Sequence, residues 1–81
     1  MSLSPIERIL EALHHAEAKH PRFACTAHEA GVVIAQEAIE HSKAVLAGDR
    51  DNEREELAQL AAVCWRRLEM MDREDESATR L

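Results

Sequence analysis

The apolar residues of this chain fall into three segments in which they recur every three or four positions, the spacing of an amphipathic α-helix. The first segment carries Ile6, Ile9, Leu10, Leu13 and Ala16. Ser4 and Glu7 give its start the pattern of a capping box, with a proline at the first helical position. Pro21 ends the segment, because the residue before a proline avoids the helical region. The sequence therefore predicts a first helix over about 5–19.

A second amphipathic segment begins at another capping pattern, in which Thr26 is followed three residues later by Glu29. Its apolar stripe consists of Ala27, Gly31, Ile34, Ala38 and Val45, and His41 occupies the remaining position of the stripe, between Ala38 and Val45. Gly48 follows the last apolar residue and suits the left-handed end of a helix. We expect a second helix over about 27–47.

The third segment begins after a cluster of turn-forming residues, where Asp51 or Asn52 is suited to cap a helix. Its apolar stripe consists of Leu57, Ala61, Cys64, Leu68 and Met71. These spacings alternate between four and three, as in a helix packed nearly parallel to a neighbour. The pattern predicts a third helix over about 52–72, whose stripe packs against that of the second helix. Residues 73–81 have no apolar period and are expected to fray.

Together the segments predict an all-α fold in one domain, residues 1–81, with the second and third helices paired as a central antiparallel hairpin. The aromatic content of 2%, with two glycines and two prolines, favours helix over sheet. A chain of 81 residues buries only about 60% of its unfolded surface, so its own core is marginal. We therefore expect a homo-oligomeric helical bundle with Trp65, Leu68 and Met71 at the interface.

The charge balance limits the partners of the chain. Ten Lys and Arg stand against sixteen Asp and Glu, which gives a formal net charge of −6 with the cations scattered among the acids. This argues against a nucleic-acid polymer as partner and leaves acidic groups that suit a divalent cation. The N-terminus lacks the pattern of a signal peptide, and no apolar run approaches the roughly 18 residues of a membrane span. We expect a cytoplasmic protein without a membrane partner, in which Cys25 and Cys64 are small apolar side chains rather than a disulfide.

Four polar side chains next to the apolar stripes are candidate metal ligands. Glu37 and Glu40 lie one turn apart on the second predicted helix, and Glu56 and Gln59 have the same spacing on the third. Counted from Gly48, Glu40 and Glu56 are each eight residues away. Glu37 and Gln59 are each eleven residues away, so an antiparallel hairpin places both pairs at matched levels. Three carboxylates and one amide oxygen form a cage that suits a hard cation such as Mg²⁺ or Mn²⁺.

The spacing Glu37-x-x-Glu40 followed by Glu56-x-x-Gln59 resembles the metal signature of the all-α nucleoside triphosphate pyrophosphohydrolases, the MazG-like group. The runs HEAGVVIAQEAIEHSKA and REELAQLAAV are similar to small phage-borne and bacterial members of that group. The resemblance implies a helical dimer or tetramer that uses Mg²⁺ to cleave nucleoside triphosphates to monophosphate and pyrophosphate. It implies that Glu37, Glu40 and Glu56 are catalytic metal ligands. Gln59 stands where the family has aspartate, which removes one charge and makes the site degenerate.

Two functions follow from these observations. The first is a MazG-like nucleotide-binding protein or hydrolase, in which Lys43 and Arg54 flank the acidic cluster and touch the phosphates. The second is a non-catalytic binding or inhibitor protein of phage type, which acts through protein contacts or nucleotide sequestration and whose metal site has decayed. A solvated helix face explains the glutamates equally well, and an ion pair with Glu40 explains Lys43.

Two further groups of residues are alternatives to this site. Glu69-x-x-Asp72 also satisfies the second half of the metal pattern, but it would lie too far along the hairpin to meet Glu37. Trp65 is followed by Arg66 and Arg67, a grouping suited either to stacking a base and holding phosphates or to an oligomer interface. The interface is the simpler explanation, because a tryptophan beside an apolar stripe favours burial against a partner.

Overall fold

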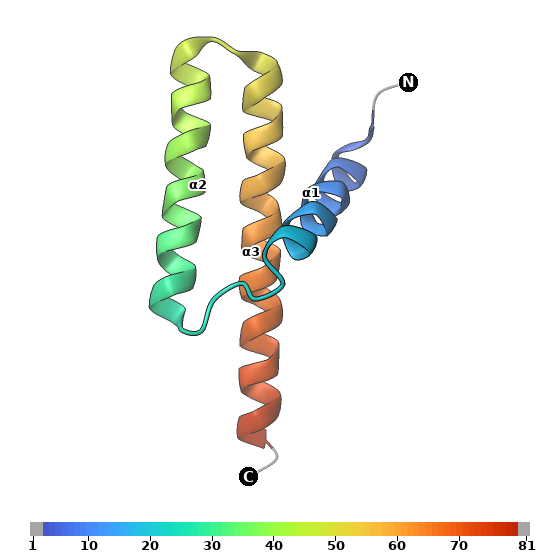
Figure 1. Cartoon of the computed structure of the whole chain (residues 1–81), viewed down its shortest axis with the longest axis vertical. Helices are drawn as coiled ribbons and strands as arrows, with labels where there is room; N and C mark the ends of the chain where they lie inside the picture. The colour runs from blue at the N-terminus through green and yellow to red at the C-terminus, as the bar shows by residue number, and fades with distance from the viewer. Residues whose placement is uncertain (1–2, 80–81) are drawn as a thin grey trace.

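The computed structural model describes residues 3–79, and these residues form three α-helices and no strand. The helices are α1 (Pro5–Lys19), α2 (Ala27–Ala47) and α3 (Arg50–Thr79), shown in Figure 1. The predicted all-α class is therefore confirmed for this part of the chain. None of the three helices combines the length and the apolarity that crossing a lipid bilayer requires.

The first two helices begin at caps that the sequence specifies. The Ser4 side chain accepts a hydrogen bond from the backbone N–H of Glu7, and the Glu7 carboxylate accepts one from the N–H of Ser4, which completes a capping box. Thr26 Oγ1 accepts from the N–H of Glu29 at 3.1 Å, but the Glu29 carboxylate accepts from the N–H of Cys25. Each cap satisfies N–H groups that the first helical turn leaves without a partner.

The connection between α2 and α3 is shorter than the sequence suggests. Gly48 has a φ of 70°, a left-handed conformation that glycine adopts without strain and that ends α2. Asp49 caps α3, because its carboxylate accepts the N–H of Asn52 at 3.1 Å. The helix therefore starts at Arg50, and Gly48 and Asp49 form the whole connection.

The end of α3 also differs from expectation. Residues 73–79, where the sequence predicts fraying, are helical and continue α3 to Thr79. This stretch contains no glycine or proline that would stop a helix. An ion pair between Arg67 and Glu74, at 3.2 Å, adds a contact along the helix. The rest of the predicted tail, 80–81, lies outside the described residues.

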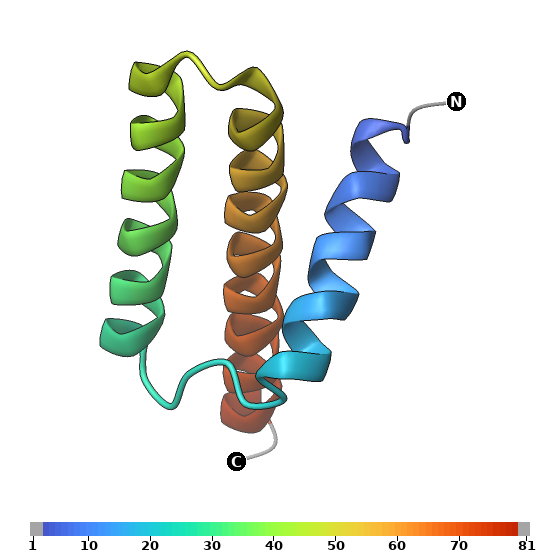
Figure 2. The same cartoon turned by 45° about the horizontal axis from the view of Figure 1, so that its top comes forward.

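α3 is the central helix of the molecule. α2 lies beside it and runs in the opposite direction, while α1 packs on another side of it at an angle (Figures 1 and 2). Within the described residues α3 contacts both of the other helices, and α1 and α2 do not contact each other. A groove therefore runs between α1 and α2, with α3 as its floor.

The core that these three helices enclose is small. Its buried hydrophobic residues, in the part of the chain that the structure describes, are Leu13, Ala30, Ala44, Ala62, Val63 and Met70. Half of them are alanines, which lets the helices approach closely but buries little apolar area. The radius of gyration is 14.3 Å, whereas about 12 Å is expected for a compact domain of this length. The single chain is therefore open rather than compact.

The apolar stripe that was predicted to join the second and third helices faces solvent instead, so that prediction is wrong. Of its residues on α3, Leu57, Cys64, Leu68 and Met71 are exposed, and Ala61 is half-buried. Leu57 also lines a small pocket together with Pro5 and Ile9 of α1. α3 packs on its neighbours through other sides, where Ala62, Val63 and Arg66 are buried. The spacing identifies an apolar side of α3 correctly, but it does not say which helix covers that side.

Candidate functional site

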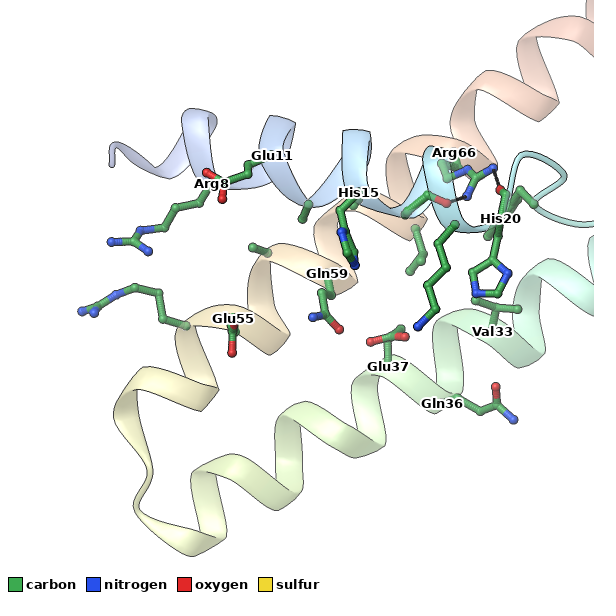
Figure 3. Close-up of a pocket in the computed structure, with 18 of the residues that line it drawn as sticks. Arg8, Glu11, His15, His20, Val33, Gln36, Glu37, Glu55, Gln59 and Arg66 are labelled. Atoms are coloured by element: carbon green, nitrogen blue, oxygen red, sulfur yellow. Dashed lines mark hydrogen bonds between the residues drawn. The ribbon is translucent and has the colours of Figure 1, made fainter. Parts of the chain in front are cut away.

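The groove between α1 and α2 has a volume of about 760 Å³ and is lined by polar and charged side chains from all three helices (Figure 3). α1 contributes Arg8, Glu11, His15 and Lys19, α2 contributes Gln36 and Glu37, and α3 contributes Arg54, Glu55, Gln59 and Arg66. The floor between these residues is apolar, with Ala58, Ala62 and Val63. The groove is therefore a cavity that can hold a ligand with both charged and apolar parts.

The structure divides the four predicted metal ligands into two groups. Glu37 and Gln59 line the groove from α2 and α3, and their side chains point toward the same part of it (Figure 3). Glu56 is half-buried, and its Oε2 atom is buried without a hydrogen-bond partner among the described residues. Glu40 is exposed, is not among the groove residues, and accepts a hydrogen bond from Lys43 at 3.4 Å.

The two predicted phosphate contacts are also separated. Lys43 forms an ion pair with Glu40 within α2, which is the alternative to a phosphate contact that the sequence left open. Lys43 is not among the groove residues. Arg54 lines the groove, and its guanidinium lies 3.6 Å from Asp51 of the same helix. An exposed pair of this kind contributes little stability, so Arg54 keeps its capacity to bind an anion.

The three glutamates interact through their charges. The pKa of Glu37 is raised above its ordinary value of 4.5, first by burial, then by the negative charge of Glu56 and then by that of Glu40. Within residues 3–79, however, no three His, Cys, Asp or Glu side chains lie close enough together to hold a metal ion. Of the two neighbouring carboxylates, Glu56 therefore acts on the pKa of Glu37 more strongly than Glu40 does.

Glu37→Gln is expected to raise the stability of the protein at neutral pH. Because the folded-state pKa of Glu37 is raised, the folded protein binds this proton more tightly than the unfolded chain does. Stability is therefore lost as the pH rises from about 4.5 through the raised pKa, and the glutamine variant avoids this loss.

Thermal unfolding at pH 4 and pH 7 measures this effect. The variant should have a Tm above that of the wild type by on the order of 2–5 °C at pH 7, with little difference at pH 4. Glu55→Gln, which changes an exposed carboxylate of the same groove, is the control and should behave like the wild type. An equal change for both variants would contradict the assignment.

α1 contributes groove residues that pattern analysis of the sequence missed. His15 points from α1 toward Gln59 and Glu37 in Figure 3, although the pair His14-His15 has no sequence context that marks it. Arg8, Ala12, His15 and Lys19 line the groove and have helical spacings of four, three and four. A search for polar residues at these spacings, rather than apolar ones alone, could have found this face.

The groove is net positive although the chain is acidic. Its Lys and Arg residues are Arg8, Lys19, Arg22, Arg54 and Arg66, and its acids are Glu11, Glu37 and Glu55. Five of the ten Lys and Arg of the chain thus meet only three of its sixteen Asp and Glu here. A concave surface of this charge attracts anions.

Arg66 has a structural role rather than a ligand-binding one. Its Nη2 atom donates to the carbonyl oxygens of His20 at 2.7 Å and Pro21 at 3.3 Å, and its Nη1 atom donates to that of Ala16 at 3.4 Å. The guanidinium carbon also lies 5.2 Å from the centroid of the Phe23 ring. Arg66 therefore ties the end of α1 and the following loop to α3, and its donors are engaged by the protein itself.

Comparison of the chain with protein-family models, with curated proteins and with solved structures gave no match. The MazG-like resemblance thus depends on the spacing of the acidic residues and on the two sequence runs that contain them. The features of the structure that bear on function are the charged groove and the carboxylates of Glu37 and Glu56.

Proposed function

We propose that the groove between α1 and α2 binds a nucleoside triphosphate through a magnesium or manganese ion held by Glu37 and Glu56. The observation that carries this proposal is the buried Oε2 atom of Glu56, which lacks a hydrogen-bond partner in the described chain and belongs to a carboxylate whose charge acts on Glu37. A buried carboxylate oxygen without a partner is unfavourable, and a second carboxylate nearby adds repulsion. A divalent cation between the two groups would offset both effects.

The charge of the groove supports a phosphate-bearing ligand. Arg8, Lys19 and Arg22 line it and belong to none of the ion pairs found within residues 3–79. They are therefore free to bind the phosphates, with Arg54 beside them. When bound, the metal ion would neutralise phosphate charge and lower the pKa of a bound water.

The proposed activity is that of a MazG-like hydrolase, which releases pyrophosphate, with a degenerate metal site. Glu37 lines the groove and provides a negative oxygen there, and Gln59 provides a neutral amide oxygen in the same groove. Glu56 is not among the groove residues and provides its half-buried carboxylate from α3. The proposed setting is the cytoplasm, where nucleotides and magnesium are abundant and where Cys25 and Cys64 remain free thiols.

A second candidate function is non-catalytic binding, either sequestration of a nucleotide or inhibition of a protein partner. It is favoured by the position of Glu40, which is paired with Lys43 rather than directed into the groove. On this account the site has two acidic ligands instead of three and positions a nucleotide without cleaving it. Glu40→Gln then leaves nucleotide binding unchanged.

We also propose that the chain works as a homo-oligomer, a dimer or a tetramer. The exposed apolar residues support this, since they include Trp65, Leu68 and Met71 of the predicted interface. Leu46 is 88% exposed and Ile39 is 54% exposed, which is unusual for large aliphatic side chains on a single small domain. Burial against other copies would complete a core that the single chain leaves small.

Thermal unfolding in a magnesium titration tests the proposed site. With Mg²⁺ at about 100 times its Kd, the wild type should gain about 2.7 kcal/mol, a rise in Tm of roughly 10–20 °C for a domain of this size. Glu56→Gln should abolish the rise, whatever its own starting Tm. Glu69→Gln should retain it, because Glu69 is exposed and belongs only to the alternative spacing match. A wild type that does not respond to Mg²⁺, or a Glu56→Gln variant that responds fully, would exclude this metal site.

Pyrophosphate release from each nucleoside triphosphate, measured with Mg²⁺ present, then separates the two functions. Release by the wild type that is lost in Glu56→Gln supports the hydrolase. Magnesium-dependent nucleotide binding without release supports the non-catalytic protein.

A further inference from the structure

A second, smaller pocket lies where α1 and α3 diverge. Arg66 ties the two helices together near the end of α1, and they separate toward the N-terminus of α1 (Figures 1 and 2). The space between their N-terminal parts forms a pocket of about 410 Å³, here called the wedge pocket. This volume lies within the range of about 300–1,000 Å³ that is typical of small-molecule sites. The residues that line it are Leu3, Pro5, Arg8, Ile9, Arg54, Leu57 and Ala58.

The wedge pocket combines an apolar wall with two arginines. Five of its seven lining residues are apolar, and the other two are Arg8 and Arg54. Among the described residues no Asp or Glu lines it, although the whole chain has sixteen acids and only ten Lys and Arg. Leu3 is 40% exposed and Leu57 is 45% exposed, so part of the apolar wall is accessible to a ligand. This lining suits a ligand that is apolar over most of its length and anionic at one end.

The charge of the wedge pocket matches a singly charged anion. Arg8 is half-buried and belongs to none of the ion pairs found within residues 3–79. Arg54 lies 3.6 Å from Asp51, so two positive charges and one negative charge leave a net charge of +1. A guanidinium group donates two parallel hydrogen bonds to a carboxylate, whose single negative charge balances the site.

The extent of the lining sets the length of the ligand. Apart from Leu3, the lining residues fall within 5–9 of α1 and 54–58 of α3. Each of these stretches extends about 6 Å along its helix axis. At about 1.2 Å per bond, an extended chain of about six carbons has the same length.

We propose that the wedge pocket binds a small aliphatic carboxylate, with its head group on Arg8 and Arg54 and its chain against Ile9 and Leu57. In Figure 3 the Arg8 side chain extends toward the end of the groove away from Glu37 and Gln59, which separates this site from the proposed metal site. The inference goes beyond the proposed function and does not depend on it. Arg8 and Arg54 also line the groove, so a bound carboxylate would compete with a nucleotide for their donors.

Nuclear magnetic resonance titration of the full chain with hexanoate, without metal or nucleotide, tests the site. The amide signals of 5–9 and 54–58 should shift together with one dissociation constant. Hexanoate should bind about tenfold more tightly than butyrate, because it places two more CH₂ groups against the apolar wall. Hexanol has the same chain without a charge and should bind at least about tenfold more weakly than hexanoate.

Arg8→Gln should weaken hexanoate binding by about tenfold or more, because it removes the charged donor with no partner of its own. Arg22→Gln is the matched control and should bind hexanoate like the wild type, since Arg22 lines the groove but not the wedge pocket. Equal losses in the two variants, or shifts spread along the whole groove, would overturn the assignment.

If Arg8→Gln does not fold, the ligand series on the wild type decides. No shift with hexanoate at tens of millimolar, or hexanol binding as tightly as hexanoate, would overturn the proposal. Neither result bears on the metal site, because the titration contains neither metal nor nucleotide.

Discussion

Arg66→Ala is expected to lower the free energy of unfolding by about 3 kcal/mol or more, a large part of the total for a domain of this size. Arg66 is only 7% exposed and donates to carbonyl groups of Ala16, His20 and Pro21. Alanine leaves these carbonyls without their charged donor and removes the contact with the Phe23 ring. α1 should then separate from α3, since Arg66 is the side chain that ties the end of α1 to that helix.

Urea unfolding followed by circular dichroism measures this loss. Arg67→Ala is the matched control, because Arg67 is the next residue and forms an ion pair with Glu74 that should contribute less than about 1 kcal/mol. Arg66→Lys should fall between the two, since lysine keeps the charge but lacks the planar fork that reaches several carbonyls. Similar unfolding energies for Arg66→Ala and Arg67→Ala would show that α1 is held by other contacts.

Ala30→Leu is expected to destabilise the fold by about 1–3 kcal/mol, a fall in Tm on the order of 10 °C. Ala30 lies on α2 and is 0% exposed, so a leucine has no space unless α2 moves away from the rest of the fold. Extra methyl groups in a packed site force side chains out of favourable rotamers or shift the backbone. Because the buried core contains so many alanines, close approach of the helices replaces large side chains as the source of packing.

Thermal unfolding of Ala30→Leu and Ala47→Leu compares a buried and an exposed alanine of the same helix. Ala47 is the last residue of α2 and is exposed, so its substitution should change stability by less than about 0.5 kcal/mol. Equal stability of the two variants would mean that α2 is free to move outward from the rest of the fold.

Local signals in the sequence predict much of the helical structure. The caps at Ser4 and Thr26 and the left-handed Gly48 depend on residues within one turn, so each is readable without knowledge of the fold. The start of α3 was predicted about two residues too late, because Asp51 or Asn52 was expected to cap the helix and Asp49 does so instead. Residues 73–79 continue the helix because the stretch contains no glycine or proline to stop it.

Contacts between distant residues were not predictable in the same way. Arg66 binds carbonyl groups that lie 45–50 residues earlier in the chain, and no local pattern marks such a pair. The stripe from Leu57 to Met71 identifies an apolar side of α3, but spacing alone does not distinguish a helix of the same chain from one of another copy. In the structure most of that side is exposed rather than packed against α2. The stripe that was expected to join two helices of one chain is therefore a candidate interface with another copy.

The candidate site was predictable only in part. The count of residues from Gly48 places the four candidate ligands at matched levels, but it does not fix the direction in which each side chain points. Glu37 and Gln59 line the groove, whereas Glu40 is turned to the surface beside Lys43. The role of α1 as the second wall of the groove has no signature in the acidic motif at all.

The most direct test of the proposed site is a crystal structure of the protein grown with Mn²⁺, in which anomalous scattering locates the ion. We predict a manganese ion between α2 and α3, bound at about 2 Å by carboxylate oxygens of both Glu37 and Glu56. Anomalous density elsewhere, for example at Glu69 and Asp72, or none beside Glu37 and Glu56 in a crystal saturated with Mn²⁺, would contradict the account.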